Sequence, residues 1–306
     1  MQPGISSQSA ESIRDRAVGA LLGLAVGDAI GTTLEFGQRD TYPHLTDMVG
    51  GGPFGLEAGM WTDDTSMALA LADSLLEKGG LDEADLMTRF CAWREEGRYS
   101  CAGHCFDIGD TVSTSLDRWL TTGDPIAGST NPDRAGNGSL MRLAPIALRF
   151  WNDLDALKDA AARQSRTTHA AGEAVDACVA YAQILAAVIA GQSLDAALDM
   201  NFDCTEFSII EIMQGSWRNK PRNLIGSSGY VVHSLEASLW SVGGGASFAD
   251  SVLTAANLGG DADTTAAITG QLAGALYGLS GIPLGWRNRV SWSKHIIEVA
   301  ERLLER

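Results

Sequence analysis

Small residues recur at every fourth position in the first long apolar segment, and this spacing constrains the fold more than any other feature of the chain. Within residues 13–27 the glycines lie at Gly19, Gly23 and Gly27, and leucines and alanines occupy the neighbouring stripe. In an α-helix, positions four apart share one face, so these glycines form a strip without side chains. A second helix can approach such a strip closely. We therefore expect this segment to be a helix at the centre of a bundle.

The helical pattern continues along the rest of the chain. Further helices are predicted at 64–78, 82–95, 108–121, 139–150, 153–164, 170–191, 227–241, 247–257, 263–278 and 289–305. Alternation typical of strands is missing, and we find no fixed-period repeat and no polar linker long enough to separate domains. The sequence therefore predicts one all-α domain over residues 1–306, with residues 1–10 as a flexible N-terminus.

Composition and charge exclude several classes of protein. Hydrophobic residues make up 45% and charged residues 20% of the chain, which excludes a disordered protein. The 22 basic and 38 acidic residues give a formal net charge of −16, so a nucleic-acid partner is not expected. We expect no signal peptide, and the longest apolar stretches, 20–27 and 177–190, are too short to span a membrane. The five cysteines show no framework spacing, so we expect a cytoplasmic protein, without membrane association because its apolar stretches are short; a monomer is the default expectation.

Two short acidic clusters, about 200 positions apart, are the strongest candidates for chemistry. They consist of Thr62, Asp63 and Asp64 in the first, and of Asp261, Asp263 and Thr264 in the second. Each cluster directly precedes a helical pattern, and a helix cap is the simplest explanation of either cluster alone. A cap needs one oxygen, however, and each cluster offers two carboxylates and a hydroxyl. Four carboxylates brought together would repel one another unless cations neutralised them, so we expect two divalent ions, Mg²⁺ or Mn²⁺.

Residues 261–265 also spell the Asp-x-Asp-x-Thr pattern of phosphatases that form an aspartyl-phosphate. That chemistry places its aspartate after a buried strand near the start of the chain, and a Rossmann-like domain follows. Here a helical pattern precedes the aspartates and only a short stretch of chain follows them. The sequence therefore argues against a phosphatase.

Further blocks along the chain, taken with the acidic clusters, resemble the ADP-ribosylglycohydrolase family. The blocks are 19–31, Glu35-Phe36, 62–65, Asp107-Ile108-Gly109, 136–142, Thr168-His169 and 259–264. The resemblance is to the branch typified by the dinitrogenase-reductase-activating glycohydrolase. It implies a compact, orthogonal helical bundle with a binuclear magnesium centre, whose ligands are the six residues of the two acidic clusters. It also implies hydrolysis of the bond between a distal ribose and a modified acceptor, which releases ADP-ribose.

The resemblance also assigns catalytic residues. Asp63 and Asp64, as metal ligands, would position the distal ribose and water. Asp107 matches the acidic residue beside the scissile bond in the arginine-specific branch, although a cap of the helix expected near Ile108 is an alternative. Glu35 matches a glutamate that approaches the metal centre, and a solvated loop carboxylate is its alternative.

A glycine-rich turn is expected to bind the diphosphate of the substrate. Asn137, Gly138 and Ser139 lie in this turn, which we expect to open a helix at Leu140. Backbone N–H groups in such a turn can hold phosphate without any lysine. Arg142, one turn into the expected helix, could pair with phosphate or with a buried carboxylate.

Three other residues complete the expected substrate site. His169 matches a family histidine near the ligand, and Tyr230 is expected to stack on adenine, although a core tyrosine is an alternative. Asp110 stands where the related enzyme has asparagine, which leaves the contacts to the leaving group open. Asp28 interrupts an apolar run, so we interpret it as a buried residue that hydrogen-bonds and orients its neighbours.

The sequence thus predicts a magnesium-dependent hydrolase that releases ADP-ribose from a mono-ADP-ribosylated protein by cleaving the N-glycosidic bond at the distal ribose. Arginine is the favoured acceptor. One alternative is the same chemistry on serine-linked, O-acetyl-linked or nucleic-acid-linked ADP-ribose. Another is a non-catalytic ADP-ribose binder or a crystallin-like structural protein. The complete set of metal ligands argues against a silent binder.

Overall fold

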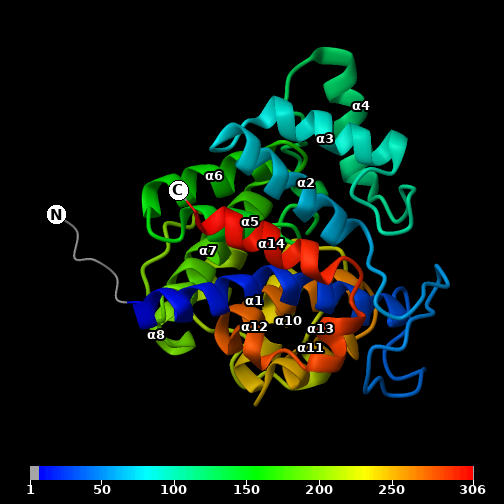
Figure 1. Ribbon diagram of the computed structural model, residues 1–306, viewed down its shortest axis with the longest axis vertical. Coiled ribbons are helices and arrows are strands. Elements are labelled where there is room, and N and C mark those ends of the chain that lie inside the picture. The colour runs from blue at the N-terminus through cyan, green and yellow to red at the C-terminus, as the bar shows by residue number, and fades with distance from the viewer. Residues whose placement is uncertain (1–6, 306) are drawn as a thin grey trace.

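The computed structural model describes residues 7–305, and it confirms the expected all-α bundle (Figure 1). Its helices are α1 (Ser7–Gly31), α2 (Asp63–Lys78), α3 (Glu83–Glu96), α4 (Asp110–Thr122), α5 (Ala144–Phe150), α6 (Leu154–Arg166), α7 (Gly172–Ile189), α8 (Leu194–Leu198), α9 (Phe207–Met213), α10 (Val231–Gly244), α11 (Phe248–Ala256), α12 (Ala262–Gly281), α13 (Leu284–Arg289) and α14 (Ser293–Leu304), with short 3-10 turns η1 (Thr32–Leu34), η2 (Pro132–Arg134) and η3 (Arg222–Leu224). Within residues 7–305 only three isolated bridges, and no sheet, connect extended segments. Most of the N-terminus expected to be flexible lies outside the described residues, and α1 begins at Ser7.

Some expected helix boundaries are wrong. The helix predicted over 139–150 begins only at Ala144, because Pro145 lacks the N–H that a longer helix would need and fits only the first turn. The helix predicted over 289–305 is divided, because the chain turns through a left-handed conformation at Trp292, with φ 57°. The short helices α8 and α9 were not predicted, since five and seven residues are too few to show a period.

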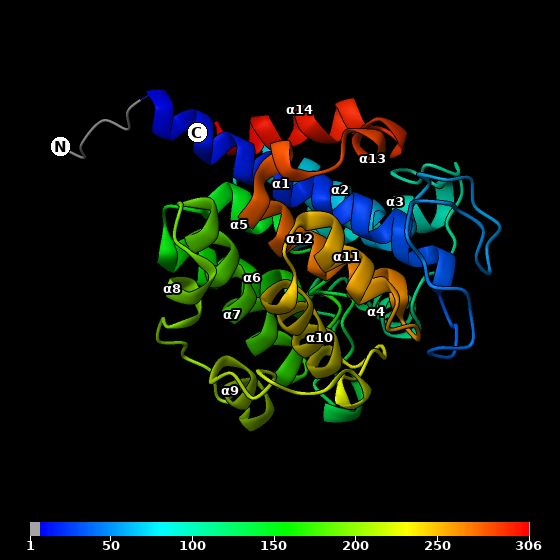
Figure 2. The same ribbon diagram turned by 90° about the horizontal axis from the view of Figure 1, so that it is seen from below.

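The centre of the bundle is the antiparallel pair α1 and α12, with α14 on one side and α7 and α10 on the other (Figure 2). Backbone meets backbone along four turns, and the close pairs are Gly19 with Gly274, Gly23 with Gly270, Gly27 with Ala266, and Gly31 with Ala262. A Cβ on Gly23 would lie well inside 3.0 Å of the carbonyl oxygen of Gly270, and the reverse also holds. The strip of glycines on α1 therefore has the role that its spacing predicts. The antiparallel pairing also brings the end of α1 beside the start of α12.

The uninterrupted apolar stretches 20–27 and 177–190 are short. The whole helices around them are, contrary to expectation, long and apolar enough to cross a membrane by length and composition alone. In the segment Ala10–Leu34, 94% of the most apolar window is buried inside the structure, and in Gly172–Ile189 the share is 72%. Other helices of the bundle therefore cover these apolar surfaces, as they cover any core helix.

We predict that Gly23→Ala lowers the free energy of unfolding by about 3 kcal/mol, because the added methyl group must force α1 away from α12. Urea denaturation followed by circular dichroism measures the effect. Gly244→Ala is the matched control, since this helical glycine has open space around it and should gain slightly from alanine. Equal stability of Gly23→Ala and wild type would contradict the backbone contact.

Candidate active site

The first acidic cluster begins α2, and Asp28 of α1 holds it in place. The Oδ1 atom of Asp28 accepts hydrogen bonds from the backbone N and the Oγ1 of Thr62, both at 2.9 Å. Its Oδ2 atom accepts from the N and the Oγ1 of Thr65, at 3.0 and 2.6 Å. The side chain of Thr62 makes no cap bond within its own helix. Asp28 therefore caps α2 from another helix, which confirms its interpretation as a buried, orienting residue and leaves Asp63 and Asp64 unused as caps.

The second cluster begins α12, and Glu35 holds it in the same way. The Oε2 atom of Glu35 accepts hydrogen bonds from the N–H groups of Ala262 at 2.7 Å and Asp263 at 3.2 Å. Glu35 is buried, with 8% of its surface exposed, so the alternative of a solvated loop carboxylate is wrong. The N-cap residue Asp261 makes no cap bond, and its Oδ2 accepts instead from Asn137 Nδ2 at 2.8 Å.

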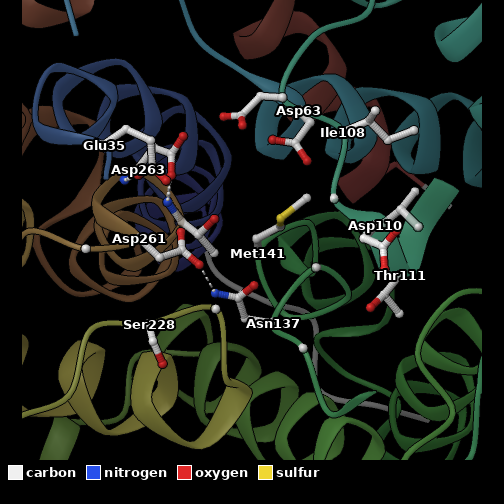
Figure 3. A pocket seen from close by; sticks show the side chains of 18 of the residues that line it. Glu35, Asp63, Ile108, Asp110, Thr111, Asn137, Met141, Ser228, Asp261 and Asp263 are labelled. Carbon is white, nitrogen blue, oxygen red and sulfur yellow. Dashed lines mark hydrogen bonds between the residues drawn. The ribbon is translucent and has the colours of Figure 1, made fainter. Parts of the chain in front are cut away.

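Carboxylates from both clusters converge. Asp28, Asp64 and Asp263 each offer an oxygen within 4.8 Å of the others, and Glu35, Asp261 and Asp263 do the same. Asp263 belongs to both groups, so the two groups are neighbours. Figure 3 shows Glu35, Asp261 and Asp263 facing the same space as Asp63 on the opposite wall. The clusters therefore form one acidic centre.

The members of the first cluster point in different directions. Asp64 is fully buried and turns toward Asp28 and Asp263, whereas Asp63 lines the cavity. Neighbours in a helix diverge by ~100°, which accounts for the difference. The Oγ1 atom of Thr62 lies 3.3 Å from Asp64 Oδ2 and 3.4 Å from Asp263 Oδ2. In the second cluster Thr264 also lines the cavity. The six expected ligands thus surround one region.

Within the described part of the chain the acidic centre has no cationic side chain in direct contact, and the positive charge nearest in effect is the buried Arg142, which interacts electrostatically with Asp63. Burial, followed by the neighbouring carboxylates, raises the pKa of Asp63, Asp64 and Asp263 well above the ordinary range. Burial likewise raises the pKa of Glu35 to about 7. Among the described residues, neither lysine nor arginine lines the cavity. A bound cation is therefore the charge that this arrangement accommodates best.

Asp107 lies on the loop before α4 and lines the same cavity. It is half-buried, its backbone is left-handed with φ 58°, and burial raises the pKa of its carboxyl to about 6. The residue at the cap position of α4 is Gly109, and α4 begins at Asp110. The alternative that Asp107 is a helix cap is therefore wrong, and its carboxyl faces the acidic centre.

The cavity has a volume of about 700 Å³. Besides the acidic centre, its lining includes the glycine-rich turn with Asn137 and Gly138, and the start of α4, whose N–H groups have no side-chain cap. His169 is buried beside this turn and also lines the cavity, and a Cβ on Gly138 would lie 2.8 Å from its Cε1. Burial, followed by the charge of Arg142, lowers the pKa of His169 to about 3. His169 therefore supports the turn as a neutral ring.

The structure corrects three expectations around this turn. No helix opens at Leu140, because the chain forms successive turns up to Ala144. The Oγ of Ser139 is buried against Ser165 Oγ at 2.8 Å, so this side chain does not face the cavity. Arg142 is also fully buried and donates to Gln164, Thr167 and Thr168, so it pairs with neither phosphate nor carboxylate.

Tyr230 lies beside the main cavity and not in its wall. It lines a second hollow of about 680 Å³, which shares Thr111, Gly136 and Gly229 with the main cavity. Its hydroxyl donates to Glu173 at 2.7 Å. One face of the residue is open, since 36% of Tyr230 is exposed. The core-tyrosine alternative is therefore wrong.

Asp110 lies at the rim of the main cavity. It is exposed, and its Oδ2 pairs with Arg134 at 2.6 Å. Residues 108–112 and Phe36 also line the cavity; they lie in or beside blocks that resemble the family, but sequence reasoning assigned a role only to Asp110 among them. The helix start predicted at 108 could have indicated the part of the lining at the start of α4. No sequence spacing predicts that a single exposed phenylalanine lines a cavity.

The fold and the acidic cavity define an all-α protein with a carboxylate-rich active-site centre. The family model for ADP-ribosylglycohydrolase matches residues 9–306, so the chain belongs to this family.

Curated relatives agree with this family. ADP-ribosylarginine hydrolase Tri1 of Pseudomonas putida (strain GB-1) is 47% identical over 97% of this chain and 80% of its own length. ADP-ribosyl-[dinitrogen reductase] glycohydrolase of Rhodospirillum rubrum is 34% identical over 91% of each chain. A solved structure titled "ADP-ribosylglycohydrolase-related protein complex" matches with a TM-score of 0.86 and 39% identity, over 96% of this chain and 98% of that one.

We predict that protein stripped of divalent cations loses stability as the pH rises from about 5 to about 8. In the folded chain the pKa values of Asp28, Glu35 and Asp107 are about 6, 7 and 6, whereas unfolded carboxyls titrate near ~4. The folded state binds more protons over this window, so its ionisation lowers the free energy of unfolding. The midpoint of thermal unfolding in chelator should fall by several degrees.

Asp263→Asn should reduce this pH dependence, because it removes one of the repelling carboxylates. Asp155→Asn, an exposed position on α6, is the matched control and should not change it. A midpoint that rises with pH in the chelated wild type would contradict the charge arrangement.

Proposed function

We propose that this protein is a magnesium-dependent hydrolase that removes ADP-ribose from arginine side chains of mono-ADP-ribosylated proteins. The observation that carries the proposal is the convergence of both acidic clusters on one cavity without a cationic side chain. The relatives named for ADP-ribosylarginine hydrolysis support arginine as the acceptor.

The donor set fits hard divalent cations. All candidate ligand atoms are oxygens, and the Oδ1 atom of Asp64 is buried with no hydrogen-bond partner among the described residues. We assign two Mg²⁺ ions, with Mn²⁺ as a substitute, to Thr62, Asp63, Asp64, Asp261, Asp263 and Thr264. When bound, the ions supply positive charge that orients the ribose hydroxyls and polarises water.

Asp107 would bind the leaving group, and Glu35 would position a ligand of the metal centre. Hydrolysis breaks the bond between the anomeric carbon of the distal ribose and a guanidine nitrogen; hydroxide from water joins the carbon and a proton joins the nitrogen. Asp107 faces the acidic centre from the loop before α4. From there its carboxylate can accept hydrogen bonds from the N–H groups of the guanidinium. Glu35 holds the start of α12, so it keeps Asp263 in place throughout.

The rest of ADP-ribose would extend away from the acidic centre. The start of α4 and the turn at Gly138 offer backbone N–H groups for the diphosphate, since helix N-termini bind anions. The second hollow adjoins them, and the open face of Tyr230 would stack on adenine there.

We expect free ADP-ribose to be released from an ADP-ribosylarginine peptide in magnesium, and the release to stop in chelator. Asp263→Asn should lower the rate at least ~1000-fold, because Asp263 belongs to both groups of converging carboxylates. Asp155→Asn should retain full activity. Chromatography of released ADP-ribose measures the rate.

Two outcomes would contradict the proposal. Undiminished release in chelator would exclude the metal centre. Release from O-acetyl-ADP-ribose or a serine-linked peptide, without release from the arginine peptide, would replace arginine with an O-linked acceptor.

A further inference from the structure

A chain of four neighbouring aromatic rings begins at Phe36 in the lining of the cavity. The ring centroids of Phe36 and Phe54 are 6.2 Å apart, those of Phe54 and Phe106 are 5.4 Å apart, and those of Phe106 and His104 are 5.7 Å apart. We call these four residues the aromatic rim. They come from two loops far apart in the sequence, one after η1 and one before α4. The aromatic rim is therefore a tertiary feature of the site.

Phe36 is the member that lines the cavity, and it is 68% exposed. Its backbone has φ 58°, a left-handed conformation that a bulky residue rarely adopts. Its N–H donates to the carbonyl of Gly260 at 2.7 Å, which ties it to the residue before the second acidic cluster. An exposed ring held in an unfavourable backbone conformation beside a reaction centre points to a function.

The chemistry around Phe36 favours a flat cation. Glu35, Phe36 and Asp107 line the same cavity, and the pKa of Glu35 is raised by burial and, to a smaller extent, by repulsion from nearby carboxylates that include Asp107. Asp110 also lines the cavity, but its Oδ2 atom is already paired with Arg134 at 2.6 Å. A guanidinium group stacks its face on an aromatic ring while its N–H groups bind carboxylates in the plane. A neutral alkyl or hydroxyl acceptor would gain less from the aromatic face and from the carboxylates than a guanidinium does.

We propose that the aromatic rim is the acceptor subsite: the guanidinium of the modified arginine stacks on Phe36 and donates its N–H groups to Asp107. Phe54 contacts Phe36 edge-on, with the ring planes at 72°. This inference rests on the proposed hydrolysis of ADP-ribosylarginine and adds the residue that selects this acceptor. An O-linked acceptor is neutral at its leaving atom, so Phe36 contributes little to its binding.

The test compares Phe36→Leu, which keeps an apolar side chain, with Phe36→Tyr, which keeps the ring. Steady-state kinetics use an ADP-ribosylarginine peptide, and calorimetry in magnesium measures the affinity of free ADP-ribose, which lacks an acceptor. Phe207→Leu is the matched control, because Phe207 is 72% exposed and lines neither hollow.

We expect Phe36→Leu to lower kcat/KM for the arginine peptide about tenfold, mainly through KM, since a desolvated cation–ring contact is of this size. Phe36→Tyr should stay within about threefold of wild type. Neither variant should change the affinity for ADP-ribose by more than about twofold. The Phe207→Leu control should match wild type in both measurements.

Other outcomes overturn the inference in distinguishable ways. If wild type cleaves the arginine peptide and Phe36→Leu cleaves it equally well, the acceptor subsite is wrong and the proposed function stands. If Phe36→Leu loses affinity for ADP-ribose in proportion to its kinetic loss, Phe36 serves the ribose and not the acceptor. If wild type does not cleave the arginine peptide, the proposed function and this inference fail together.

Discussion

The backbone contact between α1 and α12 determines where everything else in the molecule lies. Four pairs of small residues bring the two helices together over four turns, with Gly23 against Gly270 near the middle. Because the helices are antiparallel, the contact delivers the start of α12, with Asp261 and Asp263, to the end of α1. The same end of α1 carries Asp28, which caps α2. One helix thus positions both acidic clusters.

In this arrangement some carboxylates cap helices and others form the acidic centre. Asp28 and Glu35 satisfy the N–H groups at the starts of α2 and α12, a task that the first residues of a helix commonly perform themselves. The carboxylates of Asp63, Asp64 and Asp263 are consequently not used as caps: Asp64 turns toward Asp263, and Asp63 lines the cavity. Their mutual repulsion is a cost in folding, and a cation would relieve it.

Local patterns predicted much of this molecule, and features that depend on distant contacts escaped prediction. The spacing of Gly19, Gly23 and Gly27 predicted the central helix, because helical period and side-chain size are properties of the segment itself. The burial of Ser139 and Arg142 depends on α6 and the turn that follows it, which no local pattern encodes. The role of Glu35 as a cap was likewise hidden, since its partners are 227 and 228 positions away.

The geometry of the acidic centre depends on the number of residues between the glycine strip and Asp28 on α1. It does not depend on the length of the surface loops. One residue inserted between Gly23 and Asp28 would rotate Asp28 by ~100° away from α2, while the glycine contact held the first part of the helix in place. Insertions in the surface loop between η1 and α2 would leave that angle untouched. Among relatives, insertions and deletions should therefore concentrate in the loops around the cavity, and the spacing from the glycine strip to Asp28 should stay constant. Changes in these loops can alter the preferred acceptor without moving the acidic centre.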